Sequence, residues 1–236
     1  YVKYKLIAID MDGTLLNSEN TISDRNREVL NKVREKGIHV VLSTGRILKS
    51  ALHYGQSLKL NNPIVACNGA IVSDGNGKDI IYDNPIKNGV VEKLIDLSEK
   101  NHIYYHFYGV NTFYCKEYRE EITHFYESEG QQVDVVILKD LITMNKATKS
   151  NIYKFSIVED NKEKLINFRE KLESIEGINI SSSWGDNVEV MNDGVSKGNG
   201  LKSLIEKLNI HPSEVMAIGD NENDISMLKM AGLAVG

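Results

Sequence analysis

The sequence has few cysteines and no long apolar run. Cys67 and Cys115 are its only cysteines, and they lie far apart with no Cys-x-x-Cys motif. This usage predicts reduced, mostly buried thiols rather than a disulfide, as is typical of a cytoplasmic protein, and we expect that location. The longest apolar runs span only a few residues, whereas a helix that crosses a bilayer needs about 20. We therefore expect no membrane partner.

An excess of basic residues is also missing. The formal net charge is −5, so the chain has no general electrostatic reason to bind nucleic acid or an anionic membrane. No signal peptide is visible, and the chain begins at Tyr1 rather than at a methionine, which leaves open whether a leader has been removed. With 236 residues, of which 41% are hydrophobic and 26% charged, the chain can form one large or two moderate domains.

The first third of the chain alternates strand and helix patterns. Ser23 and Gly37 are suited to begin and end its first helix. Strands that alternate with helices indicate a parallel sheet, which binds ligands beyond the carboxyl ends of its strands. The predicted elements are a strand at 6–9, a helix at 24–36, a strand at 38–43, a helix at 46–58 and a strand at 64–67.

The pattern then changes and later returns. Residues 70–82 resemble a β-hairpin flap, and a less regular mixture of strands and helices, among them a helix at 118–129, extends from 86 to 185. Parallel patterning resumes with a strand at 187–191. We therefore predict an α/β fold, with a doubly wound, Rossmann-like parallel-sheet core at 1–84 and 187–236 and an inserted α+β cap domain at 85–186.

Two carboxylates follow the first predicted strand. Asp10 and Asp12 are two residues apart, so their side chains point to one side of the chain, and Gly13 then allows a sharp turn. Carboxylates this close repel, and one is driven neutral unless a cation lies between them. The pattern suits a nucleophilic carboxylate beside an acid/base carboxylate. The structural alternative is an acidic turn after a core strand.

Three further clusters lie at the ends of predicted core strands or at helix starts. Ser43 and Thr44 precede a helix and could bind an anion or only cap it. Lys197 opens a helix, where a lysine is most often solvated. Asp220 and Asp224 follow the strand at 215–218. Converging carboxylates without a cation are costly, and Mg²⁺ is the natural partner, because it binds carboxylate oxygens together with a phosphate.

With these motifs the sequence resembles the haloacid dehalogenase superfamily, and within it the Cof-type phosphatases with a large α/β cap. The resemblance rests on five motifs in the family's order and spacing: DMDGTLL at 10–16, STGR at 43–46, NGA at 68–70, VSKG at 195–198 and GDNEND at 219–224. It implies a Mg²⁺-dependent phosphatase of small phosphomonoesters, such as sugar phosphates, pyridoxal phosphate or flavin mononucleotide. The expected partner is thus a small phosphorylated metabolite.

The resemblance also assigns roles. Asp10 would form an aspartyl-phosphate, and Asp12 would act as acid/base and give Mg²⁺ its backbone carbonyl. Asp10 and Asp220 would complete the metal ligands. Asp224, Ser43 and Asn68 would support the site. Ser43 and Thr44 compete for the role of the hydroxyl that binds the phosphoryl group, and we prefer Thr44. Asn68 either contacts the substrate or only holds its turn. The residues expected to bind the phosphoryl group are Met11, Thr44, Gly45, Lys197 and Asn223.

Several alternatives stay open from sequence. A phosphomutase or phosphotransferase would use the same aspartyl-phosphate, and a receiver-like phospho-accepting module would use a similar Asp, Thr and Lys. His102 and His106 are four residues apart, but they lie in a strand-like stretch, which disfavours a zinc pair. We expect a monomer or weak homo-oligomer. Members of the family usually continue beyond the segment matching 234–236, which leaves open whether this chain is truncated after Gly236.

Overall fold

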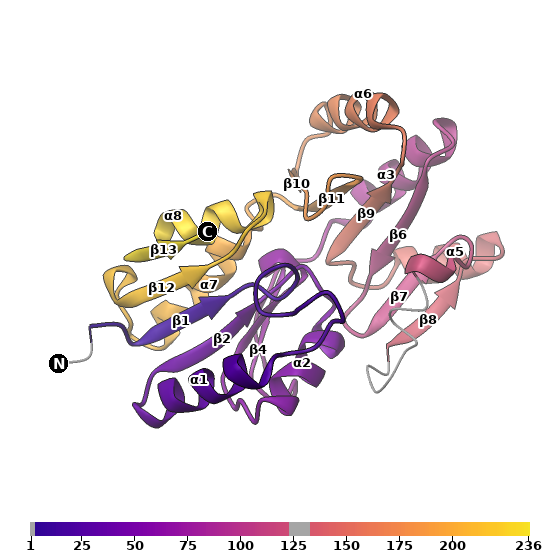
Figure 1. Ribbon diagram of the computed structural model, residues 1–236. Coiled ribbons are helices and arrows are strands. Elements are labelled where there is room, and N and C mark those ends of the chain that lie inside the picture. Colours follow the sequence, from indigo (N-terminus) through magenta and orange to yellow (C-terminus); the bar gives the residue numbers. More distant parts are fainter. Residues whose placement is uncertain (1–2, 123–132) are drawn as a thin grey trace. The chain divides into compact units, whose positions relative to one another are not determined.

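The computed structural model describes residues 3–122 and 133–236, and the chain forms two compact units (Figure 1). The first unit combines Tyr1–Asp83 with Ser196–Gly236, and the second is Asn84–Val195. Each unit has its own sheet. In the part of the chain that is described, no helix is long and apolar enough to span a bilayer.

The sheet of the first unit has seven strands in the order β13-β12-β1-β2-β3-β4-β5. Five of them run parallel, and β4 and β5 join antiparallel at one edge. The apolar run predicted at the start of the chain forms β1, an interior strand that lies between β12 and β2. The strands are β1 (Leu6–Ile9), β2 (His39–Ser43), β3 (Ile64–Ala66), β4 (Ile71–Ser73), β5 (Ile80–Asp83), β12 (Val215–Ile218) and β13 (Leu233–Val235).

Helices lie on both faces of this sheet (Figure 1). The cap residue Ser23 accepts a hydrogen bond from the Asn26 N–H, and Gly37 follows the helix at a φ of 76°, as the sequence predicted. The buried side of α7 and α8 packs on the apolar residues of β1, β2 and β3. The helices are α1 (Asp24–Glu35), α2 (Leu48–Ser57), α7 (Lys197–Lys207) and α8 (Ile225–Met230).

The strand order reverses at β1. This strand pairs with β2 on one side and with β12 on the other, although β12 comes some 200 residues later in the chain. In doubly wound sheets, such a reversal opens a crevice beyond the carboxyl ends of the two strands, and ligands bind there. The fold therefore places the residues after β1 and after β12 at one site.

The second unit has a six-stranded sheet in the order β10-β11-β9-β6-β7-β8. Its core is rich in stacked aromatic rings, with Tyr105 and Phe107 of β6 against Phe155 of β9. The strands are β6 (Tyr104–Tyr108), β7 (Thr112–Cys115), β8 (Asp134–Ile137), β9 (Lys154–Val158), β10 (Ile178–Ser181) and β11 (Asn187–Asn192), and the helices are α3 (Asn88–Lys100), α5 (Leu141–Thr148) and α6 (Lys162–Glu173).

The structure confirms the α/β class and corrects some details of the sequence prediction. Strand β11 was expected in the core, but it pairs antiparallel with β9 and β10 in the second sheet, so the second unit extends to Val195 rather than to 186. The hairpin of β4 and β5 is not a flap, because β4 pairs with β3. Strand β8 and helix α5 were missed. The helix predicted at 118–129 lies partly outside the described residues.

Candidate active site

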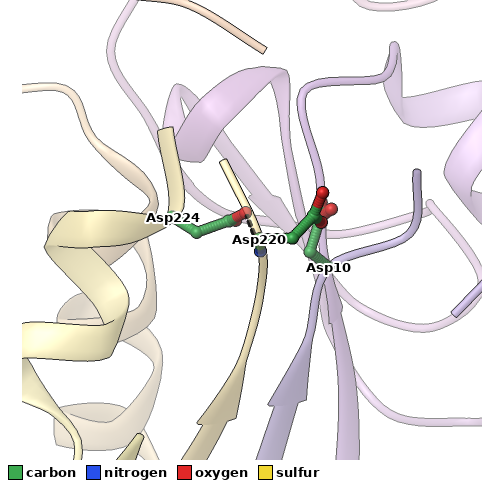
Figure 2. Close-up of side chains that lie close together, drawn as sticks. All are labelled: Asp10, Asp220 and Asp224. Carbon is green, nitrogen blue, oxygen red and sulfur yellow. Dashed lines mark hydrogen bonds between the residues drawn. The ribbon is translucent and has the colours of Figure 1, made fainter. Parts of the chain in front are cut away.

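Three carboxylates meet at the point where the strand order reverses. Asp10 follows β1, whereas Asp220 and Asp224 follow β12. Figure 2 shows the three side chains gathered at the ends of these neighbouring strands, and one oxygen of each lies within 4.8 Å of the others. Asp10 is 4% exposed and Asp224 is fully buried, whereas Asp220 is exposed. The pairing of β1 with β12 thus unites two motifs that are about 200 residues apart in the sequence.

A buried lysine joins two of these carboxylates. The Nζ atom of Lys197 donates to Oδ1 of Asp10 and to Oδ1 of Asp224, each at 2.6 Å. Ser196 caps α7 by accepting the Asn199 N–H, which fixes the first turn of the helix that carries Lys197. A fully buried ammonium is tolerated only when it is paired. A lysine at a helix start is usually solvated, but the Lys197 ammonium is an interior ion-pair partner.

The pKa values of this cluster reflect burial and pairing. Burial raises the pKa of the Asp10 carboxyl above its ordinary value, while the Lys197 ammonium and the Met11 backbone pull it down. Burial alone would lower the pKa of Lys197, but Asp10 and Asp224 raise it, so the ammonium stays charged. A neighbouring charge and burial thus act in opposite directions on each group.

Asp224 has both of its carboxylate oxygens occupied. Oδ1 accepts from Lys197, and Oδ2 accepts the N–H groups of Asp220 and Asn221, each at 3.0 Å. The dashed line in Figure 2 marks the bond to the Asp220 N–H. Asp224 therefore organises the loop after β12 and holds Lys197.

Asp220 is oriented by the loop after β1. The Thr14 hydroxyl donates to its Oδ1 at 2.6 Å, and the Asn221 side chain donates to its Oδ2 at 2.9 Å. A Cβ at Gly13, where φ is +83°, would lie 2.6 Å from Asp220 Oδ2, so only glycine fits there. The sequence did not indicate that Thr14 and Gly13 contact Asp220.

The donor set fits a hard divalent cation. Three carboxyl groups and one ammonium meet in the cluster, so acidic groups outnumber basic ones. Oxygen ligands of this kind suit Mg²⁺. Because Lys197 and backbone N–H groups occupy Asp224, the carboxylates that could hold the ion are those of Asp10 and Asp220.

The second motif turns the chain beside this cluster. The Thr44 hydroxyl accepts the Arg46 N–H at 3.1 Å and still has its own proton to donate. The Ser43 hydroxyl is buried and has no hydrogen-bond partner among the described residues. Thr44 is fully buried as well. Gly45, the next residue, is partly exposed. The choice of Thr44 over Ser43 as the anion-binding hydroxyl stays a prediction.

Asp12 is paired with Arg46. Arg46 Nε donates to Asp12 Oδ2 at 2.8 Å, and Nη2 donates to Oδ1, so the guanidinium grips both carboxylate oxygens. Arg46 is itself 4% exposed. The sequence analysis includes Arg46 in the motif STGR but assigns it no role. A charged residue directly after a buried strand is the sequence feature that could have indicated a partner for Asp12.

Asn68 and Asn223 also come together. Asn223 Nδ2 donates to Asn68 Oδ1 at 3.1 Å, and both side chains are buried. Asn223 precedes Asp224, and Asn68 follows β3. Like these two residues, all of the other residues expected in the site lie in the first unit.

Comparison with known proteins identifies the family of this chain. The family model of haloacid dehalogenase-like hydrolases matches residues 7–236. The 5-amino-6-(5-phospho-D-ribitylamino)uracil phosphatase of Bacillus subtilis is 34% identical over 234 residues, which are 99% of this chain and 84% of that protein. The pyridoxal phosphate phosphatase of Escherichia coli is 28% identical over 238 residues, or 98% of this chain and 86% of that protein.

A solved structure shares the same fold. The haloacid dehalogenase-like hydrolase from Bacillus subtilis superimposes with a TM-score of 0.87 and 28% identity, covering 98% of this chain and 88% of that one. The family model spans both units, and the sequence resemblance is confirmed. The chain belongs to the haloacid dehalogenase-like hydrolases, and it is an enzyme of that family.

Proposed function

We propose that this hydrolase is a phosphatase of small phosphomonoesters that works through an aspartyl-phosphate on Asp10. The observation that carries the proposal is the buried Lys197 ammonium, 2.6 Å from both Asp10 and Asp224, beside Asp220 at the reversal of strand order. Phosphoryl transfer depends mainly on positioning and on neutralising charge, and this cluster supplies both.

The first step would be attack of an Asp10 carboxylate oxygen on phosphorus, in line with the leaving oxygen. The bond from phosphorus to the leaving oxygen breaks, and Asp12 donates a proton to that oxygen. In the second step Asp12 takes a proton from water, the water oxygen attacks phosphorus, and the Asp10 carboxylate is released. Phosphate and an alcohol are the products.

The remaining residues would bind the transferred group. Lys197 and the Thr44 hydroxyl are suited to two of its oxygens, and the backbone N–H groups of Met11 and Gly45 and the side chain of Asn223 to the others. Mg²⁺, held by Asp10, Asp220 and the Asp12 carbonyl, would offset the charge that develops on these oxygens. Asn68 and Ser43 would support this arrangement from the ends of β3 and β2.

The substrate would be a small phosphorylated metabolite. Two relatives are named as phosphatases of a phosphoribitylaminouracil and of pyridoxal phosphate, which supports a ring-bearing phosphomonoester as the first class to assay. We further propose that Asn84–Val195 is the inserted cap domain expected from the family.

The test is a panel of phosphate esters assayed for free phosphate with Mg²⁺: sugar phosphates, pyridoxal phosphate, flavin mononucleotide and nucleotides. Asp10→Asn, which keeps the size of the side chain but removes the nucleophile, should release no phosphate above background. Formation of an isomerised sugar phosphate instead of free phosphate would identify a phosphomutase. Appreciable phosphate release by pure Asp10→Asn protein would exclude the aspartyl-phosphate.

A further inference from the structure

The turn after β3 holds three successive residues with positive φ. The angles are 49° at Cys67, 56° at Asn68 and 91° at Gly69. Two of these residues carry a Cβ, which costs roughly 1–2 kcal/mol each in the left-handed region, and all three are buried. A buried turn keeps such strain only where its surroundings enforce it, and such sites are often functional.

The backbone of this turn is tied to the second motif. The Cys67 N–H donates to the Arg46 carbonyl at 2.9 Å, and the Asn68 N–H donates to the Thr44 carbonyl at 3.0 Å. The strain is therefore imposed by the segment that carries the proposed anion-binding hydroxyl and the partner of Asp12.

The other side of the turn packs against the start of α7. A Cβ at Gly69 would collide with the carbonyl of Ser196, the residue before Lys197, and a Cβ at Gly200 would lie 2.7 Å from Gly69 Cα. Two backbones thus meet without side chains between them. This close approach fixes the position of the turn relative to the first turn of α7, which carries Lys197.

From this turn the Asn68 side chain reaches Asn223. Nδ2 of Asn223 donates to Asn68 Oδ1 at 3.1 Å. Oδ1 of Asn223 is buried and has no hydrogen-bond partner among the residues that the structure describes. A buried amide atom without a partner costs about 1–3 kcal/mol, so its retention indicates a ligand that supplies the missing bond.

We propose that Asn68 is a positioning residue that holds Nδ2 of Asn223 and thereby aims Asn223 Oδ1 at a proton of the attacking water. The inference rests on the proposed function, in which Asn223 contacts the phosphoryl group. The free atom, Asn223 Oδ1, is an acceptor and can meet a water proton, whereas the second Nδ2 proton can be donated to a phosphoryl oxygen.

The experiment removes the Asn68 side chain without adding strain. Asn68→Gly suits a φ of 56° and deletes the whole side chain, the carboxamide included. We expect kcat/KM to fall about tenfold to a hundredfold, and the affinity for orthovanadate, measured by inhibition with Mg²⁺ present, to fall about tenfold, equivalent to about 1.4 kcal/mol. Asn68→Ala should lose the same vanadate affinity but unfold at a lower temperature, because alanine is strained there.

Coupling to Asn223 distinguishes positioning from a separate contact. Asn223→Ala should lose at least as much kcat/KM as Asn68→Gly, and the double variant should be no worse than Asn223→Ala alone. The matched control is Asn209→Gly, at the exposed end of α7 with a φ of 53°, which should leave both kcat/KM and vanadate affinity unchanged.

Three results would overturn the inference. These are an Asn68→Gly protein with wild-type kcat/KM and vanadate affinity, losses that add in the double variant, and an Asn223→Ala protein without any loss. Each can occur while the wild type is active and Asp10→Asn is dead, so each would leave the proposed phosphatase function standing. A wild type inactive on every ester would instead count against the phosphatase.

Discussion

Arg46 holds the carboxylate of Asp12 through two parallel hydrogen bonds, from Nε to Oδ2 at 2.8 Å and from Nη2 to Oδ1. The guanidinium lies over the ring of Tyr54, with its carbon 5.0 Å from the ring centre. A planar fork that meets a carboxylate in this way fixes its orientation as well as its position. The proposed acid/base is therefore oriented by the last residue of the second motif.

Replacing Arg46 should reduce catalysis most for poor leaving groups. Arg46→Lys keeps the charge but not the fork, and we expect kcat to fall about tenfold; Arg46→Met should cost about a hundredfold. The loss should be larger for an alkyl phosphate than for p-nitrophenyl phosphate, because p-nitrophenolate needs little protonation. Arg27→Met is the control, since the Arg27 guanidinium donates to the Ser57 carbonyl at the end of α2. An equal loss for both esters would mean that Arg46 only supports the fold.

Removal of divalent metal should abolish activity. EDTA should stop turnover and Mg²⁺ should restore it, whereas Ca²⁺, with its longer and less regular coordination, should support little. Full activity in the presence of chelator would refute the metal requirement.

Thr14 should tune the metal requirement through Asp220. Because its hydroxyl donates to Asp220 Oδ1 at 2.6 Å, Thr14→Val should raise the Mg²⁺ concentration for half-maximal activity about tenfold. Thr14→Ser retains the hydroxyl and is the matched control. If both variants need the same Mg²⁺ concentration as the wild type, Thr14 does not orient a metal ligand.

Much of the fold was predictable because local patterns and the fold agree. The run Leu6–Ile9 is apolar throughout because both faces of β1 are covered, and the motif residues follow strands whose carboxyl ends meet. Strand β11 was misplaced for a physical reason. Its alternation of Val188 and Val190 with polar residues suits either sheet, and only the pairing with β9 and β10 decides.

The contacts within the site could not be read from spacing. Lys197 at a helix start reads as solvated, and its burial follows from the approach of Asp10 and Asp224 from two other segments. Arg46 with Asp12, and Asn68 with Asn223, are likewise bonds between loops of different strands. Such pairs depend on strand order, which the sequence specifies only through the fold as a whole.

Asp12→Asn should separate the two chemical steps. The variant keeps a backbone carbonyl for the metal and leaves Asp10 free to attack, so substrate should still bind. It loses the proton donor and the base, which are typically worth about 10²–10⁴ in rate. With p-nitrophenyl phosphate, we expect a burst of nitrophenolate followed by a stall as aspartyl-phosphate accumulates. If alkyl and aryl esters slow equally with no burst, Asp12 is not the acid/base.

His106 should make the second unit less stable in mild acid. Its ring is buried on β6, and burial, reinforced by Lys154 and Arg119, lowers its pKa to about 3 from an ordinary value of 6.5. Between these values the unfolded chain binds a proton that the folded chain does not, so stability falls as the pH drops below about 6.5. Between pH 7 and pH 5 the loss from this group should be about 2 kcal/mol.

The measurement is urea unfolding followed by the fluorescence of Trp184, the one tryptophan of the chain, which lies in the second unit. His106→Gln removes the titrating ring, so its stability should depend less on pH over this range by about 2 kcal/mol, whatever its stability at pH 7. His53→Gln, in α2 of the first unit, is the control and should keep the wild-type pH dependence of this signal. A loss of stability in acid requires a group that the folded chain holds neutral and the unfolded chain protonates. A His106→Gln protein that loses as much stability in acid as the wild type would therefore show that this group is not His106.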